Sequence, residues 1–227
     1  MKNALAYEWV RVRSLRSTWL LLVGAGVLQF ASGLYWGLKR DLGDLDAFVS
    51  AFGLVDRLGA VLVAAVGITA FGLDHQHGTL ATTRLVLRSP ARIVTARALV
   101  TAGLGLLTGV LMVVLTAAGV LTGGGVLPAD AGAAGRAVGA VLLLTVLSGL
   151  AGVALGGLLR HTGLAVGVFA VWTFVAETTL ATLADVPMTA LPFSGTALFA
   201  VTGSVVFAVL AVAGLGATAF TLARRAG

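Results

Sequence analysis

Few side chains in this sequence have the types and spacing that catalysis or metal binding requires. The chain has no cysteine and three histidines, so thiolate chemistry, disulfides and cysteine-based metal sites are excluded. His75 and His77 are two residues apart and do not face each other on a helix. Only Asp74 lies close by as a further ligand, so we expect no metal site.

Nucleophilic catalysis by serine needs a base within hydrogen-bond reach of the hydroxyl. Ser148 and Ser204 fall in apolar runs and Ser194 in a loop, whereas the histidines border polar segments, and no G-x-S-x-G motif occurs. An intramembrane serine protease is therefore a remote alternative, and we expect no catalytic residue. The chain also lacks G-x-x-x-x-G-K-[ST], so it cannot hold ATP phosphates in a P-loop.

The elements that position these residues are long apolar stretches. The chain is 59% hydrophobic and 11% charged, with a mean hydropathy of +1.04, well above the near-half apolar share of soluble domains. Blocks of about 20 apolar residues fit helices that cross about 30 Å of hydrocarbon. We predict an all-α integral membrane protein, a single domain over 1–227, with six transmembrane helices at 19–38, 49–73, 93–121, 137–159, 164–183 and 197–223.

Arginine and lysine predict the orientation of these spans. Six spans place both termini on one side, which carries eleven of the basic residues against four on the other. Because basic residues favour the cytoplasmic side, we expect both termini in the cytoplasm and the chain in the plasma membrane, in a bacterium. In a membrane protein the side on which basic residues fall matters more than the net charge, here +6. We therefore expect no nucleic-acid partner.

Several charged residues fall within the predicted spans. Glu177 lies about 20 Å along its span at 1.5 Å per residue, where an acid is costly and faces a bundle interior, a water-filled cavity or a partner. Trp172 and Thr173 are close in the same span, and Asp56 and Arg57 lie near the outer end of another. We expect these five residues to line a polar pathway or a subunit seam. A single structural hydrogen bond from Glu177 is the alternative. For Asp56 and Arg57 the alternative is that each side chain extends to the outer headgroups, and an Arg57–Glu177 pair is a further hypothesis.

Residues 1–18 predict an amphipathic helix that lies in the membrane interface. Apolar residues including Trp9 recur at helical spacing, and Arg11, Arg13 and Arg16 make the segment basic. Tryptophan is typical of the headgroup level, and arginine of contact with anionic lipid. The alternative is an ordinary basic flank of the first span.

A polar segment, DHQHGTLATTRLVLRSPARIVTAR, occupies residues 74–97. Gly78 is typical of a helix C-terminus, and Ser89-Pro90 is typical of a helix start. Between them, Thr79 begins a predicted short helix over 79–88, on which Arg84 and Arg88 share one face. A basic amphipathic helix of this kind lies on anionic lipid or docks into a groove on a partner.

The same segment resembles a pattern of ABC type-2 transporter permeases: an acidic residue, three residues, Gly-Thr, about ten residues, Pro and Arg. Here these are Asp74, Gly78, Thr79, Pro90 and Arg92. The resemblance extends to the basic N-terminal helix, the six spans and a proline-containing loop before the last span. One departure is Asp74, where the family commonly has the longer glutamate.

The resemblance implies a function for the whole chain. It implies an exporter in which two permeases, here a homodimer, form the substrate pathway and two cytosolic ABC ATPase subunits bind Mg-ATP. Residues 79–88 would be the coupling helix that docks on the ATPase, and this chain itself would be neither an enzyme nor a cofactor carrier. The alternative is a membrane anchor, sensor or immunity protein without transport.

Overall fold

The computed structural model describes residues 2–39, 44–77 and 89–224. No strand occurs in these ranges, and six of their helices are long and apolar enough to cross a membrane. The predicted all-α membrane fold is therefore confirmed. The helices are α1 (Lys2–Ser14), α2 (Arg16–Leu38), α3 (Asp44–His77), α5 (Pro90–Thr122), α6 (Ala131–Leu159), α7 (Thr162–Val171), α8 (Glu177–Leu183), α9 (Pro192–Ala197) and α10 (Val201–Arg224).

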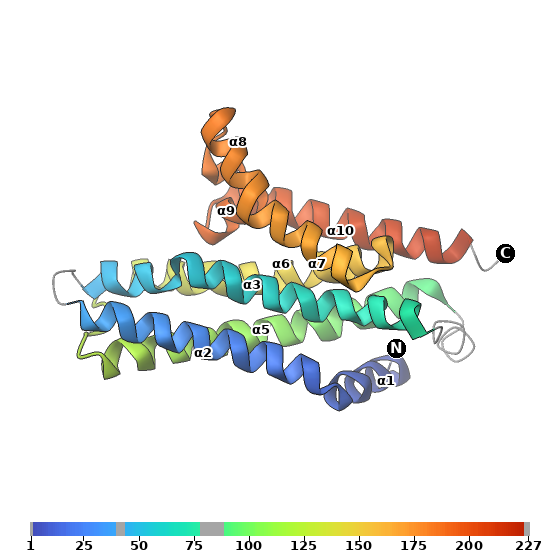
Figure 1. Cartoon of the computed structure of the whole chain (residues 1–227), viewed down its shortest axis with the longest axis horizontal. Coiled ribbons are helices and arrows are strands. Elements are labelled where there is room, and N and C mark those ends of the chain that lie inside the picture. The colour runs from blue at the N-terminus through green and yellow to red at the C-terminus, as the bar shows by residue number, and fades with distance from the viewer. Residues whose placement is uncertain (1, 40–43, 78–88, 225–227) are drawn as a thin grey trace.

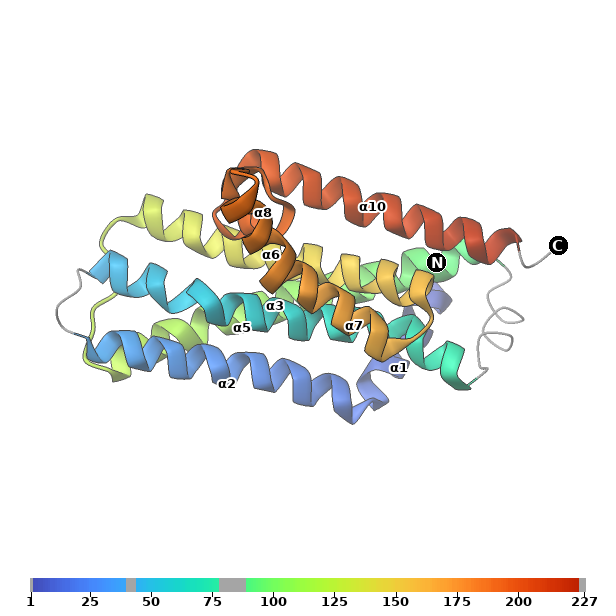
Figure 2. The ribbon, with the colours of Figure 1, turned by 45° about the horizontal axis from the view of Figure 1, so that its top comes forward.

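The centre of the fold is a bundle of α2, α3, α5 and α6, which run side by side (Figure 1). Helix α2 packs on α3 and α5, and α6 packs on α3 and α5 from the other side. Helix α7 lies on α3 and α6, while α10 lies on α6 (Figure 2). The first residue of α1 and the last of α10 lie at the same end of the bundle, where α3 ends and α5 begins (Figure 1). We call this the terminal end.

Small residues let the bundle helices approach closely. A Cβ at Gly152 would lie 2.2 Å from the Ala64 carbonyl oxygen, and one at Gly156 would lie 2.4 Å from that of Ile68. Helices α2 and α5 approach in the same way, since a Cβ at Gly33 would lie 2.5 Å from the Thr116 carbonyl oxygen. In lipid, such contacts supply van der Waals packing that larger residues would prevent.

The N-terminal segment divides earlier than the sequence predicts. Helix α1 ends at Ser14, and Leu15 takes extended angles (φ −86°, ψ 104°) before α2 begins at Arg16. Across this break the Trp19 indole N–H donates to the Arg13 carbonyl oxygen at 3.2 Å. Arg16 therefore belongs to the first span and not to the helix predicted over 1–18. Helix α1 packs on α5 and α2.

Two later spans also have bounds that differ from the prediction. Helix α6 begins at Ala131 because the Asp130 carboxylate accepts hydrogen bonds from the Gly132 and Ala133 amides at 2.9 and 3.1 Å, as an N-cap does. The last span begins at Val201, not at residue 197, because Pro192–Ala197 forms the separate helix α9. A 3-10 turn, η2 (Met188–Ala190), precedes α9.

Candidate functional site

A buried arginine joins three helices at the terminal end. The Arg97 side chain on α5 is fully buried, and its Nε donates to Glu8 Oε1 on α1 at 3.0 Å. Its Nη2 donates to Asp74 Oδ2 near the end of α3. The Phe71 ring lies 4.1 Å from its Cζ, a cation–π distance. Glu8 also accepts from Arg11 Nε at 2.8 Å, and we call these five residues the Arg97 cluster.

The charges of the Arg97 cluster suit its burial. Two carboxylates oppose one guanidinium, and Arg11 supplies a second positive charge at its edge. Arginine's fixed fork of donors can bind two acids at once, which a lysine ammonium does with less geometric control. Removing one partner from such a buried group leaves an uncompensated charge, so the cluster holds α1, α3 and α5 in one arrangement.

Sequence reasoning identified Asp74 and Arg11 but missed the pairing with Arg97 and Glu8. A signal was present, because Arg97 lies inside the predicted span 93–121 and an arginine in hydrocarbon needs a partner. Of the nine acidic residues in the chain, Glu8 and Asp74 are the two on the predicted cytoplasmic side. Both bind Arg97.

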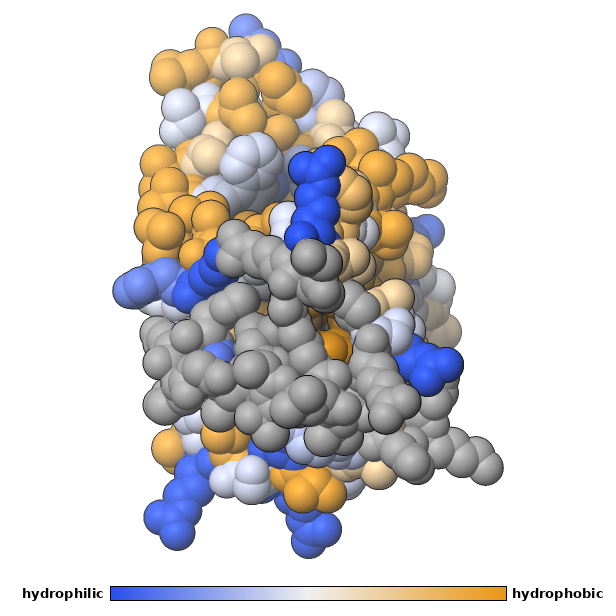
Figure 3. Space-filling model, turned by 90° about the vertical axis from the view of Figure 1, so that its right-hand side faces the viewer, coloured by the Kyte–Doolittle hydropathy of each residue, from blue (hydrophilic) through white to orange (hydrophobic). Residues whose placement is uncertain are grey.

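The other residues predicted to dock a partner are placed only in part. Gly78, Thr79, Arg84 and Arg88, and with them the whole predicted helix 79–88, lie outside the described residues. Pro90 is the first residue of α5, as predicted, although the Ser89 side chain makes no capping hydrogen bond. Arg92 is exposed on the first turn of α5. Seen from the terminal end, hydrophilic side chains project around the described part of this face (Figure 3).

The residues predicted for the interfacial helix over 1–18 differ in how exposed they are. Trp9 is exposed over 46% of its surface, and Arg13 and Arg16 are exposed. Arg11 is half-buried by its bond to Glu8. Exposed tryptophan and arginine beside a buried Val12 agree with a helix that has one face on the bundle.

A second polar cluster surrounds Glu177, which is fully buried. Its Oε1 accepts from the Phe193 amide at 2.7 Å and from the Trp172 indole N–H at 3.1 Å. Its Oε2 accepts from both the amide and the hydroxyl of Ser194, each at 2.7 Å. These amides belong to the first turn of α9, where the backbone N–H groups have no helical partner. The Glu177 carboxylate thus caps α9 from a different helix.

A π-helical turn, η1 (Trp172–Ala176), brings Trp172 and Glu177 together. In an α-helix, residues five apart differ by about 140° around the axis, at 3.6 residues per turn. A π-helix pairs residue i with i+5, and the Glu177 amide donates to the Trp172 carbonyl in this way. The Trp172 indole therefore reaches Glu177, while the buried Thr173 hydroxyl donates to the Phe169 and Ala170 carbonyls of its own helix.

Arg57 meets the Glu177 cluster through Ser194. Its Nη2 donates to Ser194 Oγ at 3.2 Å, and Ser194 Oγ in turn donates to Glu177. Among the described residues no ion pair joins Arg57 to Glu177, so the hypothesised contact is indirect. Glu177 makes several structural hydrogen bonds, whereas the alternative interpretation from the sequence is a single one. A subunit seam or pathway at this place stays a prediction.

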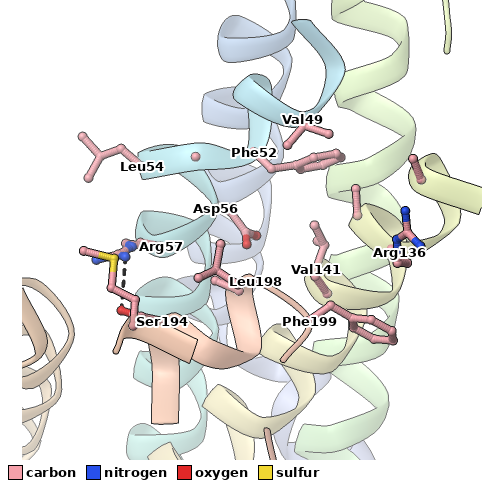
Figure 4. A pocket seen from close by; sticks show the side chains of 16 residues that line it. Val49, Phe52, Leu54, Asp56, Arg57, Arg136, Val141, Ser194, Leu198 and Phe199 are labelled. Carbon is pink, nitrogen blue, oxygen red and sulfur yellow. Dashed lines mark hydrogen bonds between the residues drawn. The ribbon is translucent and has the colours of Figure 1, made fainter. Parts of the chain in front are cut away.

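A pocket of about 630 Å³ opens beside this cluster, between α3, α6 and α9 (Figure 4). Asp56 and Arg57 line it from α3, Arg136 from α6 and Ser194 from α9. Figure 4 shows the Asp56 carboxylate near its middle, with Arg57 and Arg136 on different sides. Asp56 and Arg57 line one cavity, while Trp172 and Thr173 are not among its lining residues.

The described residues bear on two kinds of chemistry, metal binding and a nucleophilic serine. Within the described ranges no group of three or more metal-ligating side chains occurs. Ser194 has a carboxylate and an arginine as its hydrogen-bond partners, and this arrangement lacks the histidine base that an activated serine uses.

Comparison with known proteins gives no assignment. No model of a known protein family matches the chain, and a search of curated proteins finds no significant match. The family resemblance at Asp74, Gly78, Thr79, Pro90 and Arg92 therefore stays a prediction, and what is established is a six-span, all-α membrane protein with buried ionic clusters.

Proposed function

We propose that this chain is the membrane subunit of an ATP-binding-cassette exporter. Two copies form the substrate pathway, and a separate cytosolic ATPase docks on the segment 78–88 that links α3 to α5. The terminal end faces the cytoplasm, since most basic residues lie there. The proposal rests on the residue pattern from Asp74 to Arg92 and on the Arg97 cluster.

The Arg97 cluster is the observation that carries the proposal. The segment 78–88 begins four residues after Asp74, and α5 begins at Pro90, seven residues before Arg97. Arg97 binds Asp74 on one flank of this segment and Glu8 on α1. A force applied to this segment would therefore act on α1, α3 and α5 together, rather than move an isolated loop. Interfaces of this kind pass motion between discrete arrangements.

Energy for transport has to come from another chain. The sequence carries no P-loop to hold ATP phosphates. A cytosolic ATPase that binds Mg-ATP supplies this activity in the proposed complex. Lipid surrounds the exposed apolar faces of α2, α7 and α10.

Purification of the chain from its native cells in mild detergent tests the docking. We expect an accompanying protein that carries a P-loop and hydrolyses ATP, and we expect the double variant Arg84→Glu, Arg88→Glu to lose it. The matched control is Arg13→Glu, Arg16→Glu, which reverses two exposed arginines at the same end and should retain it. If the Arg84, Arg88 reversal keeps the ATPase bound, the docking site is wrong.

A further inference from the structure

Asp56 is a buried acid for which the described residues supply no hydrogen-bond or ion-pair partner. It is 3% exposed, its Oδ1 has no hydrogen-bond partner, and no ion pair among the described residues includes it. Glu177, in contrast, accepts four hydrogen bonds. A buried carboxylate without a donor is costly, and the Asp56 carboxylate lines the pocket between α3, α6 and α9 (Figure 4).

The pocket is built by a break in α3. Gly53 has non-helical angles (φ 4°, ψ −121°), and a Cβ placed on it would meet no atom within 4 Å. In an unbroken helix the Ala51 carbonyl would accept from the amide four residues later, across this break. Instead, Ser32 Oγ on α2 donates to the Ala51 carbonyl at 2.7 Å, and Gln29 Nε2 lies at 3.4 Å. The break is thus fixed by α2 and leaves open space beside Asp56.

The remaining lining has two kinds of chemistry. Arg57 and Arg136 supply positive charge on two sides of Asp56, and Arg57 is held at Ser194. Apolar side chains, including Phe52, Leu198 and Phe199, form much of the wall. The volume of about 630 Å³ lies within the range of small-molecule sites, which are mostly apolar with a few placed polar groups.

We propose that this pocket binds a zwitterionic amphiphile. Its ammonium group donates to the Asp56 carboxylate, its phosphate or carboxylate meets Arg57 and Arg136, and its apolar part packs on Phe52 and Leu198. A simple cation would face the repulsion of the two arginines, and a simple anion would leave Asp56 unpaired. Two sources have this chemistry: a resident phospholipid of the ethanolamine type, and an amphiphile that the protein carries. The site does not depend on the proposed ATPase.

Binding to the purified full-length chain in detergent, without nucleotide, tests the site. The probe is dihexanoyl phosphatidylethanolamine, and the comparison probe is dihexanoyl phosphatidylglycerol, which lacks the ammonium group. We expect the ethanolamine lipid to bind more tightly and Asp56→Asn to weaken it about tenfold or more, since a desolvated charge pair is lost. Asp185→Asn makes the same change at an exposed residue outside the pocket, at a positive φ of 49° that asparagine adopts, and should bind as the wild type does.

A second variant keeps the test valid if Asp56→Asn fails to fold. Leu198 is exposed and lines the pocket, so Leu198→Trp should fold and weaken binding by filling the space. Lipid extraction from the purified protein separates the two sources. Ethanolamine lipid retained by the wild type and lost from Leu198→Trp indicates a resident lipid, and a protein without such lipid that binds the probe indicates a carried amphiphile. Equal affinity for both probes, or unchanged affinity in both pocket variants, overturns the proposal.

Discussion

Arg97, Glu177 and Asp56 show three ways in which this chain holds a charge inside apolar surroundings. Arg97 is paired with carboxylates from two other helices. Glu177 binds backbone and side-chain donors from the start of α9 and from Trp172. Asp56 has neither and faces a cavity. The first two residues therefore stabilise the fold, whereas the third is available for a ligand.

Replacement of Arg97 by alanine should strongly destabilise the protein. Glu8 and Asp74 would then lose the buried guanidinium that both bind, and breaking a buried pair costs about 3–5 kcal/mol. Thermal unfolding in detergent, followed by helical circular dichroism, measures the effect. Arg92→Ala, which removes an exposed arginine of the same helix, is the control. Equal unfolding temperatures for the wild type and Arg97→Ala would show that the cluster does not stabilise the fold.

Replacement of Glu177 by glutamine should loosen the start of α9. Glutamine has one acceptor oxygen, so its NH₂ group would face either the Ser194 donors or those of Phe193 and Trp172, at a cost of about 1–3 kcal/mol. We expect the amide protons of Phe193 and Ser194 to exchange with solvent faster. Thr178→Ala, whose hydroxyl donates only within its own helix at 3.1 Å, should leave the exchange unchanged. Unaltered exchange in Glu177→Gln would contradict the capping role.

The sequence predicts these residues only in part. Glu177 is recognisable in the sequence as an acid inside an apolar run. Its partners are not, because two of them are backbone amides in the first turn of α9. The Arg97 partners were within reach of charge counting, since Glu8 and Asp74 are the acids on their side. The free oxygen of Asp56 depends on the break at Gly53, which helical periodicity does not reveal.

Among the elements, the α3–α6 pair depends most on small residues. Gly152 and Gly156 bring α6 against the α3 backbone, and a Cβ at Gly67 would lie 2.3 Å from the Gly149 carbonyl oxygen. Small residues spaced by four, such as Ser148, Gly152 and Gly156, allow close packing either within a chain or between subunits. In this structure, Gly152 and Gly156 contact α3 of the same chain.

Gly152→Ala should destabilise the bundle by about 1–3 kcal/mol, because the added methyl forces the helices apart. Its matched control is Gly103→Ala on α5, where a Cβ meets no atom within 4 Å. This control should change stability by less than about 1 kcal/mol, with any change toward greater stability because alanine reduces the freedom of the unfolded chain. The unfolding midpoints of both variants in detergent measure this difference in stability. A Gly152→Ala protein as stable as Gly103→Ala would contradict the close packing.

Hydropathy predicts the long elements well and the short ones poorly. Six spans follow from apolar runs of sufficient length. The break at Leu15, the π turn at Trp172–Ala176 and the six-residue α9 are too short for hydropathy to detect, and α9 also depends on tertiary contacts. For α9 these contacts are the hydrogen bonds from its first turn to Glu177. No local sequence signal determines such contacts.

For the whole molecule, the two ionic features lie far apart along the bundle. The Arg97 cluster is at the terminal end, and the Asp56 pocket lies toward the opposite end of α3. The 18 residues from Asp56 to Asp74 on α3 span about 27 Å at 1.5 Å per residue. Helix α3 carries both Asp56 and Asp74, so a movement of its terminal end is expected to reach the pocket.

The coupling between the docking segment and the Asp56 pocket can be measured directly in the proposed complex with its ATPase. The chain has no native cysteine, so Leu198→Cys places a single reactive thiol at the pocket, and its rate of labelling by a water-soluble maleimide is measured with and without a non-hydrolysable ATP analogue. We expect the analogue to change the labelling rate, and we expect the Arg84→Glu, Arg88→Glu double variant to abolish that change. An unchanged rate while the ATPase remains bound and occupied by nucleotide would contradict this coupling.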